Sequence, residues 1–277
     1  RRLDLLVKEG LVIQTGTTIG KDITGKELLD NFDALCIAIG AGYPRSLPVE
    51  GSEFEGIYYA LDFLTSQNKV NSGQLSVSNN PISAEGKRVL VIGGGDTGSD
   101  CVGTSIRQKA VSVTQIEILP KPPLNRTPDN PWPYYAKVLK TSTSHEEGCE
   151  RLWNLSTLRF VGDGRITRGA EVEEVSWEYS DNKYIMKPVP ETRRVIETDL
   201  VLLALGFVHP VLEGLVTELG FELDARNNVK VDNHQVTSLK KVFAAGDTVN
   251  GTSLVVNAIA SGRRAAKYID KYLRSME

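Results

Sequence analysis

Uninterrupted apolar segments, rather than alternating ones, form the main hydrophobic pattern of this chain of 277 residues. Residues 34–39, 89–92, 200–205 and 242–245 are such segments, and each leads directly into glycine. Strands without alternation are typical of a parallel sheet that is buried on both faces. The pattern therefore predicts an α/β fold with parallel strands.

Two of these segments repeat the same order of residue types. Residues 33–40 and 199–206 both begin with Asp, continue with an apolar run and end at glycine, Gly40 in one and Gly206 in the other. We interpret this as an internal repeat at the level of two nucleotide-binding domains. Gly40 and Gly206 are therefore candidate cofactor-binding residues.

Other segments alternate or follow a helical period. Residues 170–179, 184–188 and 193–197 predict an antiparallel β-meander, with turns at 180–182 and 190–191. A long helix is predicted over residues 253–273. Its apolar stripe consists of Val255, Ala258, Ile259, Gly262, Ala266, Ile269 and Leu273.

The glycines after residues 88–92 match the pattern G-x-G-x-x-G. Gly93 would make the turn, Gly95 would let a pyrophosphate approach the backbone, and Gly98 would let the following helix pack on the strand. A strand precedes the pattern, a helix is predicted over 97–109, and a strand over 112–119 completes a βαβ unit. The stretch predicts a dinucleotide site that binds phosphates at the helix N-terminus, rather than a structural turn. Its candidate residues are Gly93, Gly94, Gly95, Asp96, Thr97 and Gly98.

The end of the second strand bears on which nicotinamide cofactor binds. Glu117 lies about 20 residues beyond the glycines, where a carboxylate binds the ribose 2′-OH of NAD and repels a 2′-phosphate. Lys121 and Arg126 follow it and are candidates for pairing with such a phosphate. Glu117 favours NADH, although a solvated strand end is the alternative interpretation.

A second motif follows residues 242–245. An Asp at the end of a strand, here Asp247 after Gly246, accepts hydrogen bonds from polyol hydroxyls, and the glycine permits close approach of a ligand. The helix beginning near Thr252, Ser253 and Leu254 would direct its positive end at the electron-rich edge of a flavin. The alternative is a strand, a turn and a capping Asp.

Composition excludes several classes of protein. The net charge is -3, and no basic block suggests a nucleic-acid partner. No apolar run reaches the roughly 18 residues of a membrane span. The three cysteines, Cys36, Cys101 and Cys149, form no C-x-x-C pair, which argues against a disulfide scaffold, a zinc site or a redox dithiol. We expect a cytoplasmic protein.

These motifs together resemble the flavoprotein reductases with two dinucleotide-binding domains, and within them the small (β) subunit of glutamate synthase. The similarity covers essentially the whole chain in order, and the proline-rich loop, residues 120–133, is specific to that branch. It rests on residues 91–101, 119–123, 129–133, 144–148 and 245–265. The resemblance implies two Rossmann-like lobes, with an NAD(P)H lobe inserted in a discontinuous FAD lobe. It also implies hydride transfer from NAD(P)H to FAD, and then electron transfer through iron–sulfur clusters to the large (α) subunit, which makes glutamate from glutamine and 2-oxoglutarate.

The chain also departs from this family. The family's FAD-side G-x-G-x-x-G and its cysteine-rich cluster domain lie upstream of anything present here, so the iron–sulfur clusters belong to that upstream region. We expect residues 1–50 and 210–277 to form part of the FAD-binding domain and residues 51–209 to form the NAD(P)H domain. With an incomplete flavin site, this chain alone is expected to bind FAD poorly.

We predict no catalytic side chain and no metal ligand, because hydride passes directly from nicotinamide to flavin. His145, beside Glu146 and Glu147, is interpreted as part of a helix start or a surface cluster. Other functions remain open. One is a related reductase subunit, dihydropyrimidine dehydrogenase-like or ferredoxin-linked. Another is a nucleotide-binding or docking fragment without turnover. Thioredoxin-reductase-like activity is disfavoured by the missing C-x-x-C.

Overall fold

The computed structural model describes residues 1–180 and 183–276, and the chain divides into two compact units. The first unit comprises Arg1–Arg45 and Phe207–Glu277, and the second comprises Ser46–Gly206. The chain passes from one unit to the other after Arg45 and after Gly206, in each case a few residues before the predicted domain boundaries at 50 and 209. The reason is pairing within the first unit, where Tyr43 N donates to His209 O and Val208 N donates to Tyr43 O, both at 2.9 Å.

The second unit is built on a five-stranded sheet in which every pair is parallel. Its order is β2-β10-β3-β4-β5. The central strand β3 is the apolar segment that precedes the glycines, and β10 is the segment that precedes Gly206. The bounds are β2 Ile57–Tyr59, β3 Arg88–Ile92, β4 Ser112–Ile116, β5 Glu150–Leu152 and β10 Leu200–Leu203.

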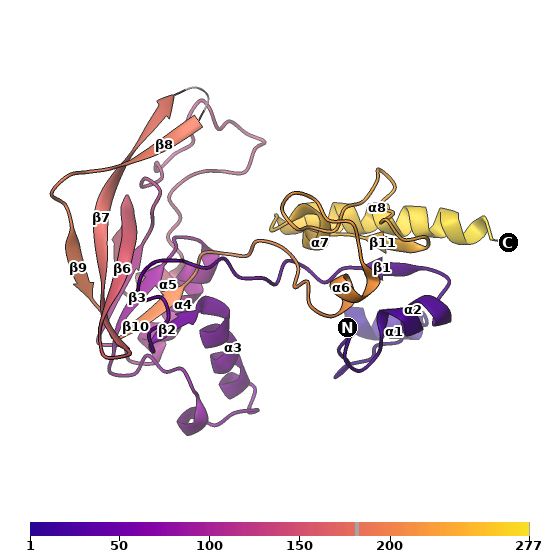
Figure 1. Ribbon diagram of the computed structural model, residues 1–277, viewed down its shortest axis with the longest axis horizontal. Helices are drawn as coiled ribbons and strands as arrows, with labels where there is room; N and C mark the ends of the chain where they lie inside the picture. The colour runs from indigo at the N-terminus through magenta and orange to yellow at the C-terminus, as the bar shows by residue number, and fades with distance from the viewer. Residues whose placement is uncertain (181–182, 277) are drawn as a thin grey trace. The chain divides into compact units, whose positions relative to one another are not determined.

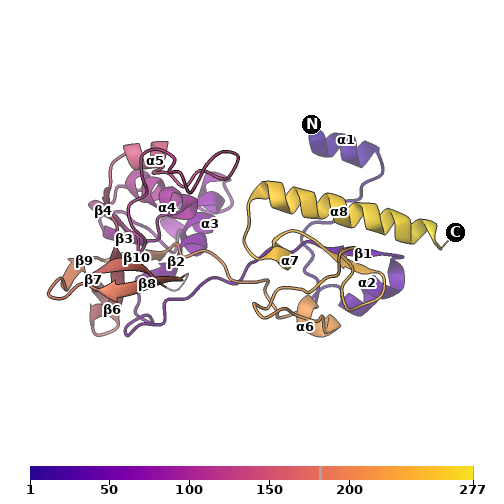
Figure 2. The ribbon, with the colours of Figure 1, turned by 90° about the horizontal axis from the view of Figure 1, so that it is seen from above.

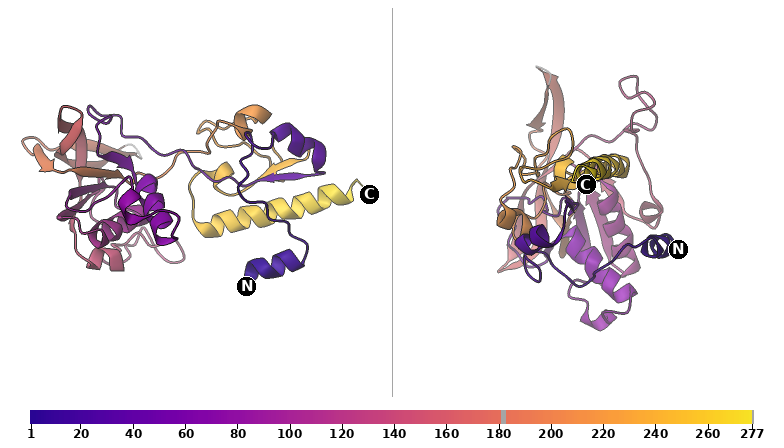
Figure 3. Two further views of the ribbon diagram at one scale, coloured as in Figure 1. Left: turned by 90° about the horizontal axis from the view of Figure 1, so that it is seen from below. Right: turned by 90° about the vertical axis from the view of Figure 1, so that its right-hand side faces the viewer.

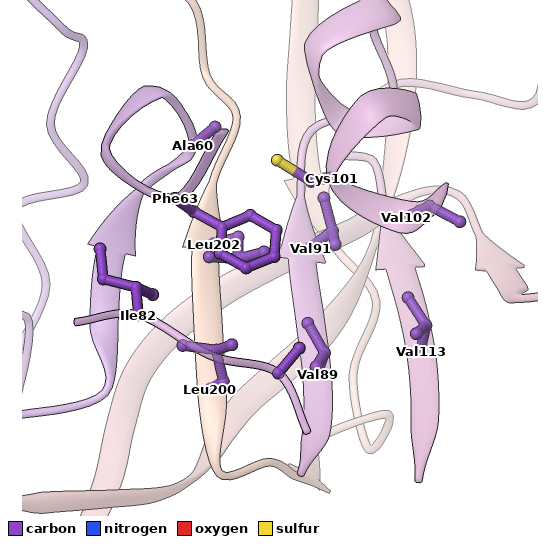
Figure 4. Close-up of a cluster of buried hydrophobic side chains, with 11 residues drawn as sticks. Ala60, Phe63, Ile82, Val89, Val91, Cys101, Val102, Val113, Leu200 and Leu202 are labelled. Atoms are coloured by element: carbon purple, nitrogen blue, oxygen red, sulfur yellow. The ribbon is translucent and has the colours of Figure 1, made fainter. Parts of the chain in front are cut away.

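Helices cover one face of this sheet. The helices α3 (Ala60–Asn71) and α4 (Asp96–Arg107) pack on it, and a short 3₁₀ turn, η1 (Val77–Asn79), follows α3. Figure 4 shows Phe63 of α3 and Cys101 of α4 directed at the strands. Both side chains are fully buried. The core on this face consists of Ala60, Phe63, Ile82, Ala84, Val89, Val91, Cys101, Val102, Val113, Leu200 and Leu202.

Antiparallel strands cover the opposite face, where Leu90, Ile116 and Val201 pack against Phe160 and Val172. These strands are β6 (Leu155–Asp163), β7 (Ile166–Ser180), β8 (Lys183–Pro188) and β9 (Arg194–Glu197). The long strand β7, seen in Figure 1, pairs with β6, β8 and β9.

The predicted meander is therefore wrong in its order. Strand β9 pairs with the first half of β7 and not with β8, which pairs with the second half. The sequence also did not suggest β6, which alternates poorly. The predicted turn at Asp181 and Asn182 lies outside the described residues.

The first unit contains a two-stranded parallel sheet, β1 (Leu35–Ile37) and β11 (Val242–Ala244). Its core joins these strands to residues of α6 and to Phe221 and Val229. The long helix α8 lies beside β11 (Figure 1), and α1 stands apart from the sheet on the side where α8 lies (Figures 2 and 3). The helices are α1 Arg2–Lys8, α2 Gly25–Asn31, α6 Leu215–Leu219, α7 Asp247–Asn250 and α8 Val255–Arg274.

Helix α8 forms where it was predicted, but its apolar stripe is not its buried face. Its buried residues are Ser261 and Ala265. Val255 is 74% exposed and Ile259 is 56% exposed. The described residues of the first unit therefore leave an apolar helix face open to solvent.

An ion pair joins the start of the central strand to the start of its neighbour. Arg88 Nε donates to Asp199 Oδ2 and Nη2 donates to Oδ1, both at 2.9 Å, while the backbone N of Arg88 donates to Oδ2 at 3.1 Å. These bonds from Arg88 lower the pKa of Asp199 from its ordinary value of 3.8 to about 2. The carboxylate thus stabilises the β3–β10 pair as long as it is ionised.

We predict that Asp199→Ala lowers the free energy of unfolding by about 1–3 kcal/mol at neutral pH, because the guanidinium loses its two hydrogen bonds to this carboxylate and the backbone N–H of Arg88 loses its acceptor. The contribution is fully present above pH 3.8 and is lost as the pH falls through about 2. Urea unfolding of the two proteins over this range should show the difference shrinking in acid. Glu197→Ala is the control, because Glu197 also pairs with Arg88 but its side chain is 76% exposed, and exposed pairs contribute roughly 0–1 kcal/mol.

Candidate functional site

The glycine turn after β3 is held by close backbone contacts. Gly93 has φ +124°, and a Cβ built there would lie 2.3 Å from Ala204 O, just after β10. A Cβ on Gly98 would lie 2.2 Å from Gly93 O. Both glycines are therefore required for packing between strand, turn and helix. Gly206 follows Ala204 by two residues at this same end of the sheet.

Gly95 differs from these two glycines. Its backbone is in an ordinary extended conformation, with φ -81°, and a Cβ there would have nothing within 4 Å. No packing contact accounts for a glycine at this position. The open space is what close approach of a ligand to the backbone requires.

Helix α4 begins at Asp96, directly after Gly95, and Thr97 lies in its first turn. Among the described residues, no side chain caps its N-terminus. The first N–H groups of a helix lack partners within the helix, and the dipole there favours an anion. The predicted residues Gly94, Gly95, Asp96 and Thr97 thus lie together at an N-terminus suited to phosphate.

Glu117 directly follows β4 and contacts the glycine turn. Its Oε2 accepts a hydrogen bond from Gly94 N at 2.7 Å, and its Oε1 accepts one from Leu119 N at 3.0 Å. The carboxylate therefore joins two backbone segments at the edge of the site. An ionised carboxylate has about four acceptor positions, so both oxygens can still accept from a ribose hydroxyl.

A cavity of about 350 Å³ opens at this point of the second unit. Gly94, Gly95, Asp96 and Glu117 line it, together with Pro120 and Pro122 of the proline-rich loop and Tyr135–Lys140 after that loop. The cationic residues among its described lining are Lys137, Lys140 and Arg151.

The two cations proposed from the sequence, Lys121 and Arg126, are not among the described residues that line this cavity, although Lys121 contacts the lining residue Trp153. Lys121 Nζ lies 4.9 Å from the ring centroid of Trp153. Arg126 Nη1 donates to the carbonyls of Asn130 and Tyr134, at 3.1 and 2.8 Å, and so holds the loop to itself. Lys121 and Arg126 were suggested by their position shortly after Glu117 in the sequence. The cations that line the cavity, Lys137, Lys140 and Arg151, come later in the chain.

His145 also lines the cavity, together with Ser99 and Ser142. It lies in the short helix α5 (Thr143–Glu146), where Ser142 and His145 form a reciprocal cap. The interpretation of His145 as part of a helix start is confirmed. The sequence did not show that the histidine would face the cavity.

The residues proposed to contact flavin lie together in the first unit. The parallel pairing of β1 with β11 puts their C-terminal ends at one edge, where Gly40 N donates to Thr248 Oγ1 at 2.9 Å. Gly246 has φ +71°, and Ser253 Oγ donates to Asp247 Oδ1 at 2.8 Å. Thr252, Ser253 and Leu254 precede α8 and are exposed.

Comparison with known proteins identifies the family. The pyridine nucleotide-disulphide oxidoreductase family matches residues 4–262. This chain belongs to that family. The prediction of a pyridine-nucleotide-linked oxidoreductase is thereby confirmed.

Within this family, the chain is similar to proteins named as glutamate synthases. A protein of Mycobacterium tuberculosis named glutamate synthase [NADPH] small chain is 44% identical over 279 residues, which cover 99% of this chain and 56% of the relative. Glutamate synthase [NADH] of Schizosaccharomyces pombe is 38% identical, over 98% of this chain and 13% of the relative. The predicted resemblance to the glutamate synthase small subunit is confirmed. The chain spans little more than half the length of the M. tuberculosis relative.

A solved structure supports the fold. FprA of Mycobacterium tuberculosis superposes with a TM-score of 0.69 at 14% identity, over 94% of this chain and 68% of that one. The predicted α/β class with two Rossmann-like lobes is confirmed. One lobe, the second unit, is inserted in the sequence of the other. No helix among the described residues is long and apolar enough to cross a membrane.

The three glycines of the turn should respond differently to alanine. Gly93→Ala and Gly98→Ala should lower the free energy of unfolding by about 1–3 kcal/mol or more, because a Cβ meets backbone in both. Gly95→Ala should leave stability unchanged and weaken nucleotide binding by about tenfold or more, since its Cβ enters the space left for the ligand.

Thermal unfolding and titration with NAD+ measure the two effects. Gly262→Ala in α8 is the control, because a Cβ there also meets nothing within 4 Å. Loss of stability without loss of binding in Gly95→Ala would contradict the assignment of Gly95.

Proposed function

We propose that this chain is the electron-input part of a glutamate synthase small subunit, acting in the cytoplasm. In this function hydride passes from NAD(P)H to FAD, and electrons then pass through iron–sulfur clusters to a large subunit that makes glutamate from glutamine and 2-oxoglutarate. The observation that supports it best is Gly95, an open glycine at an uncapped helix N-terminus beside a cavity, within a chain 44% identical to a named small chain.

The second unit fits a nicotinamide dinucleotide. The space beside Gly95 accommodates a pyrophosphate against the backbone, and the N-terminus of α4 supplies unpaired N–H groups and a favourable dipole. Glu117 supplies acceptors for ribose hydroxyls at the adjoining edge. The bound dinucleotide supplies the hydride, and the role of these residues is to bind and orient it.

The first unit fits only part of a flavin site. Gly40, Gly246 and Asp247 lie at one edge of β1 and β11, which suits contact with a ribityl chain. The described residues place no phosphate-binding glycine turn in this unit, and the sheet has two strands. Val255 and Ile259 of α8 are exposed beside it. We therefore propose that this chain alone binds FAD poorly.

We propose NADH as the hydride donor, because Glu117 places an ionised group at the ribose edge and would repel a 2′-phosphate. A second candidate is NADPH, favoured by the cations Lys137, Lys140 and Arg151 on the cavity wall. The relatives' names include both cofactors.

The two candidates differ in kcat/KM of the full-length protein that contains this chain. We expect a higher value for NADH than for NADPH, and we expect Glu117→Gln to reduce the difference. Lys140→Met and Arg151→Met test the cations. A preference for NADPH that either substitution removes would contradict the NADH assignment and support the second candidate.

Turnover separates the electron-input function from a docking module. With added FAD, the full-length protein should oxidise NADH in the presence of an artificial electron acceptor, and Gly95→Ala should lose most of that activity. Nucleotide binding without any oxidation would support a docking module instead. Oxidation that a large subunit cannot couple to glutamate formation would support a related reductase.

A purified chain that carries stoichiometric FAD would contradict the proposed weak flavin binding.

A further inference from the structure

A buried glutamine connects the glycine turn to His145 of α5, which lines the cavity. Gln115 lies on β4 and is 2% exposed. Its Nε2 donates to Gly93 O at 2.9 Å. Because a carbonyl oxygen only accepts, this bond fixes the orientation of the amide, and Gln115 Oε1 is left as an acceptor facing α5.

His145 is the hydrogen-bond partner of that acceptor. Its Nε2 lies 3.0 Å from Gln115 Oε1, and its Nδ1 lies 3.1 Å from the backbone N of Ser142. The amide oxygen requires a donor and the backbone N–H requires an acceptor. Only the neutral ring with its proton on Nε2 satisfies both.

We propose that His145, as the neutral Nε2–H tautomer, is a positioning residue for the dinucleotide site. It holds residues 142–147 against the glycine turn through Gln115, and so fixes the position of α5 relative to that turn. The inference rests on the proposed function of this cavity as the nicotinamide dinucleotide site.

Several contacts depend on this placement. Ser142 is hydrogen-bonded to Ser99 in the first turns of α4, and both line the cavity with His145. Arg107 of α4 pairs with Glu147, which ends α5. Gln115 Nε2 also lies 2.7 Å from where a Cβ on Gly98 would stand, so the glutamine fills the space beneath the helix start. Displacing His145 therefore moves groups at the phosphate end of the site.

Protonation should disrupt the arrangement, because a proton on Nδ1 would face the N–H of Ser142. Burial, and then the charge of Arg151, lower the pKa of His145 from its ordinary value of 6.5. The exposed Glu146 and the Arg107–Glu147 pair lie beside it on α4 and α5. The other charged residues that line its cavity are Asp96, Glu117, Lys137 and Lys140. The neutral ring, and the wall it holds, are thus maintained above the lowered pKa and lost as the pH falls through it.

Two amide substitutions separate the roles of the ring nitrogens. In His145→Gln the amide nitrogen takes the place of Nε2 and keeps the donor to Gln115. In His145→Asn the amide oxygen takes the place of Nδ1 and keeps only the acceptor for Ser142. Glu146→Ala, at the exposed neighbouring position, is the matched control.

The measurement is the dissociation constant for NAD+ of the full-length protein by calorimetric titration, from about pH 8 to about pH 5. We expect wild type and Glu146→Ala to bind equally well and to lose affinity together as the pH falls through the lowered pKa of His145. His145→Gln should keep the affinity within about threefold and lose the pH dependence. His145→Asn should be about tenfold weaker throughout, the effect of an unpaired buried acceptor.

Identical pH profiles for wild type and His145→Gln would overturn the proposal, as would full affinity in His145→Asn. Should His145→Asn not fold, the pH profile of His145→Gln alone decides. A wild-type protein that binds neither NAD+ nor NADP+ would overturn the proposed function and this inference with it, whereas tight binding with no role for His145 would overturn only the inference.

Discussion

The second unit depends on one close backbone contact, between Gly93 and the end of β10. At this point the central strand turns towards α4, and the space between Gly93 and Ala204 excludes even a methyl group. Gly98 then approaches Gly93 from the helix side just as closely. Strand, turn and helix can meet only because both residues lack a side chain. The parallel register of β3 with β10 and β4 brings the C-terminal ends of these strands to the turn, so the site lies at the edge where α/β sheets bind ligands.

Polar groups then hold the cavity around this contact. Glu117 accepts from the turn on one side, and Gln115 donates to its carbonyl on the other. Both belong to the end of β4 or follow directly after it, so a single strand sets the outer edge of the turn. In the proline-rich loop and directly after it, Arg126 satisfies two backbone carbonyls, those of Asn130 and Tyr134. A loop that satisfies its own backbone in this way keeps its shape without a regular element.

The first unit has a buried core but leaves the apolar stripe of its longest helix, α8, exposed. Its strands β1 and β11 and the residues of α6 form a buried core. The stripe of α8, however, faces solvent at Val255 and Ile259. A helix normally buries its apolar stripe, because tertiary packing supplies most of its stability. Contacts with the described residues therefore do not account for the apolar stripe of α8.

Local sequence by itself determined the β3–turn–α4 unit, the parallel strands and the position of Glu117. Those features follow from short-range constraints, namely an unalternating apolar run, glycines at fixed spacing and a carboxylate at the next strand end. The tertiary structure decided what spacing cannot show. It paired β9 with β7 rather than β8, and it left Lys121 and Arg126 out of the cavity lining. It also brought Lys137, Lys140 and Arg151 to the cavity wall and His145 to Gln115. The placement of these cations and of His145 depends on the path of the chain between β4 and β5. Hydrogen bonds within that segment set its path, and no periodicity in the chain encodes it.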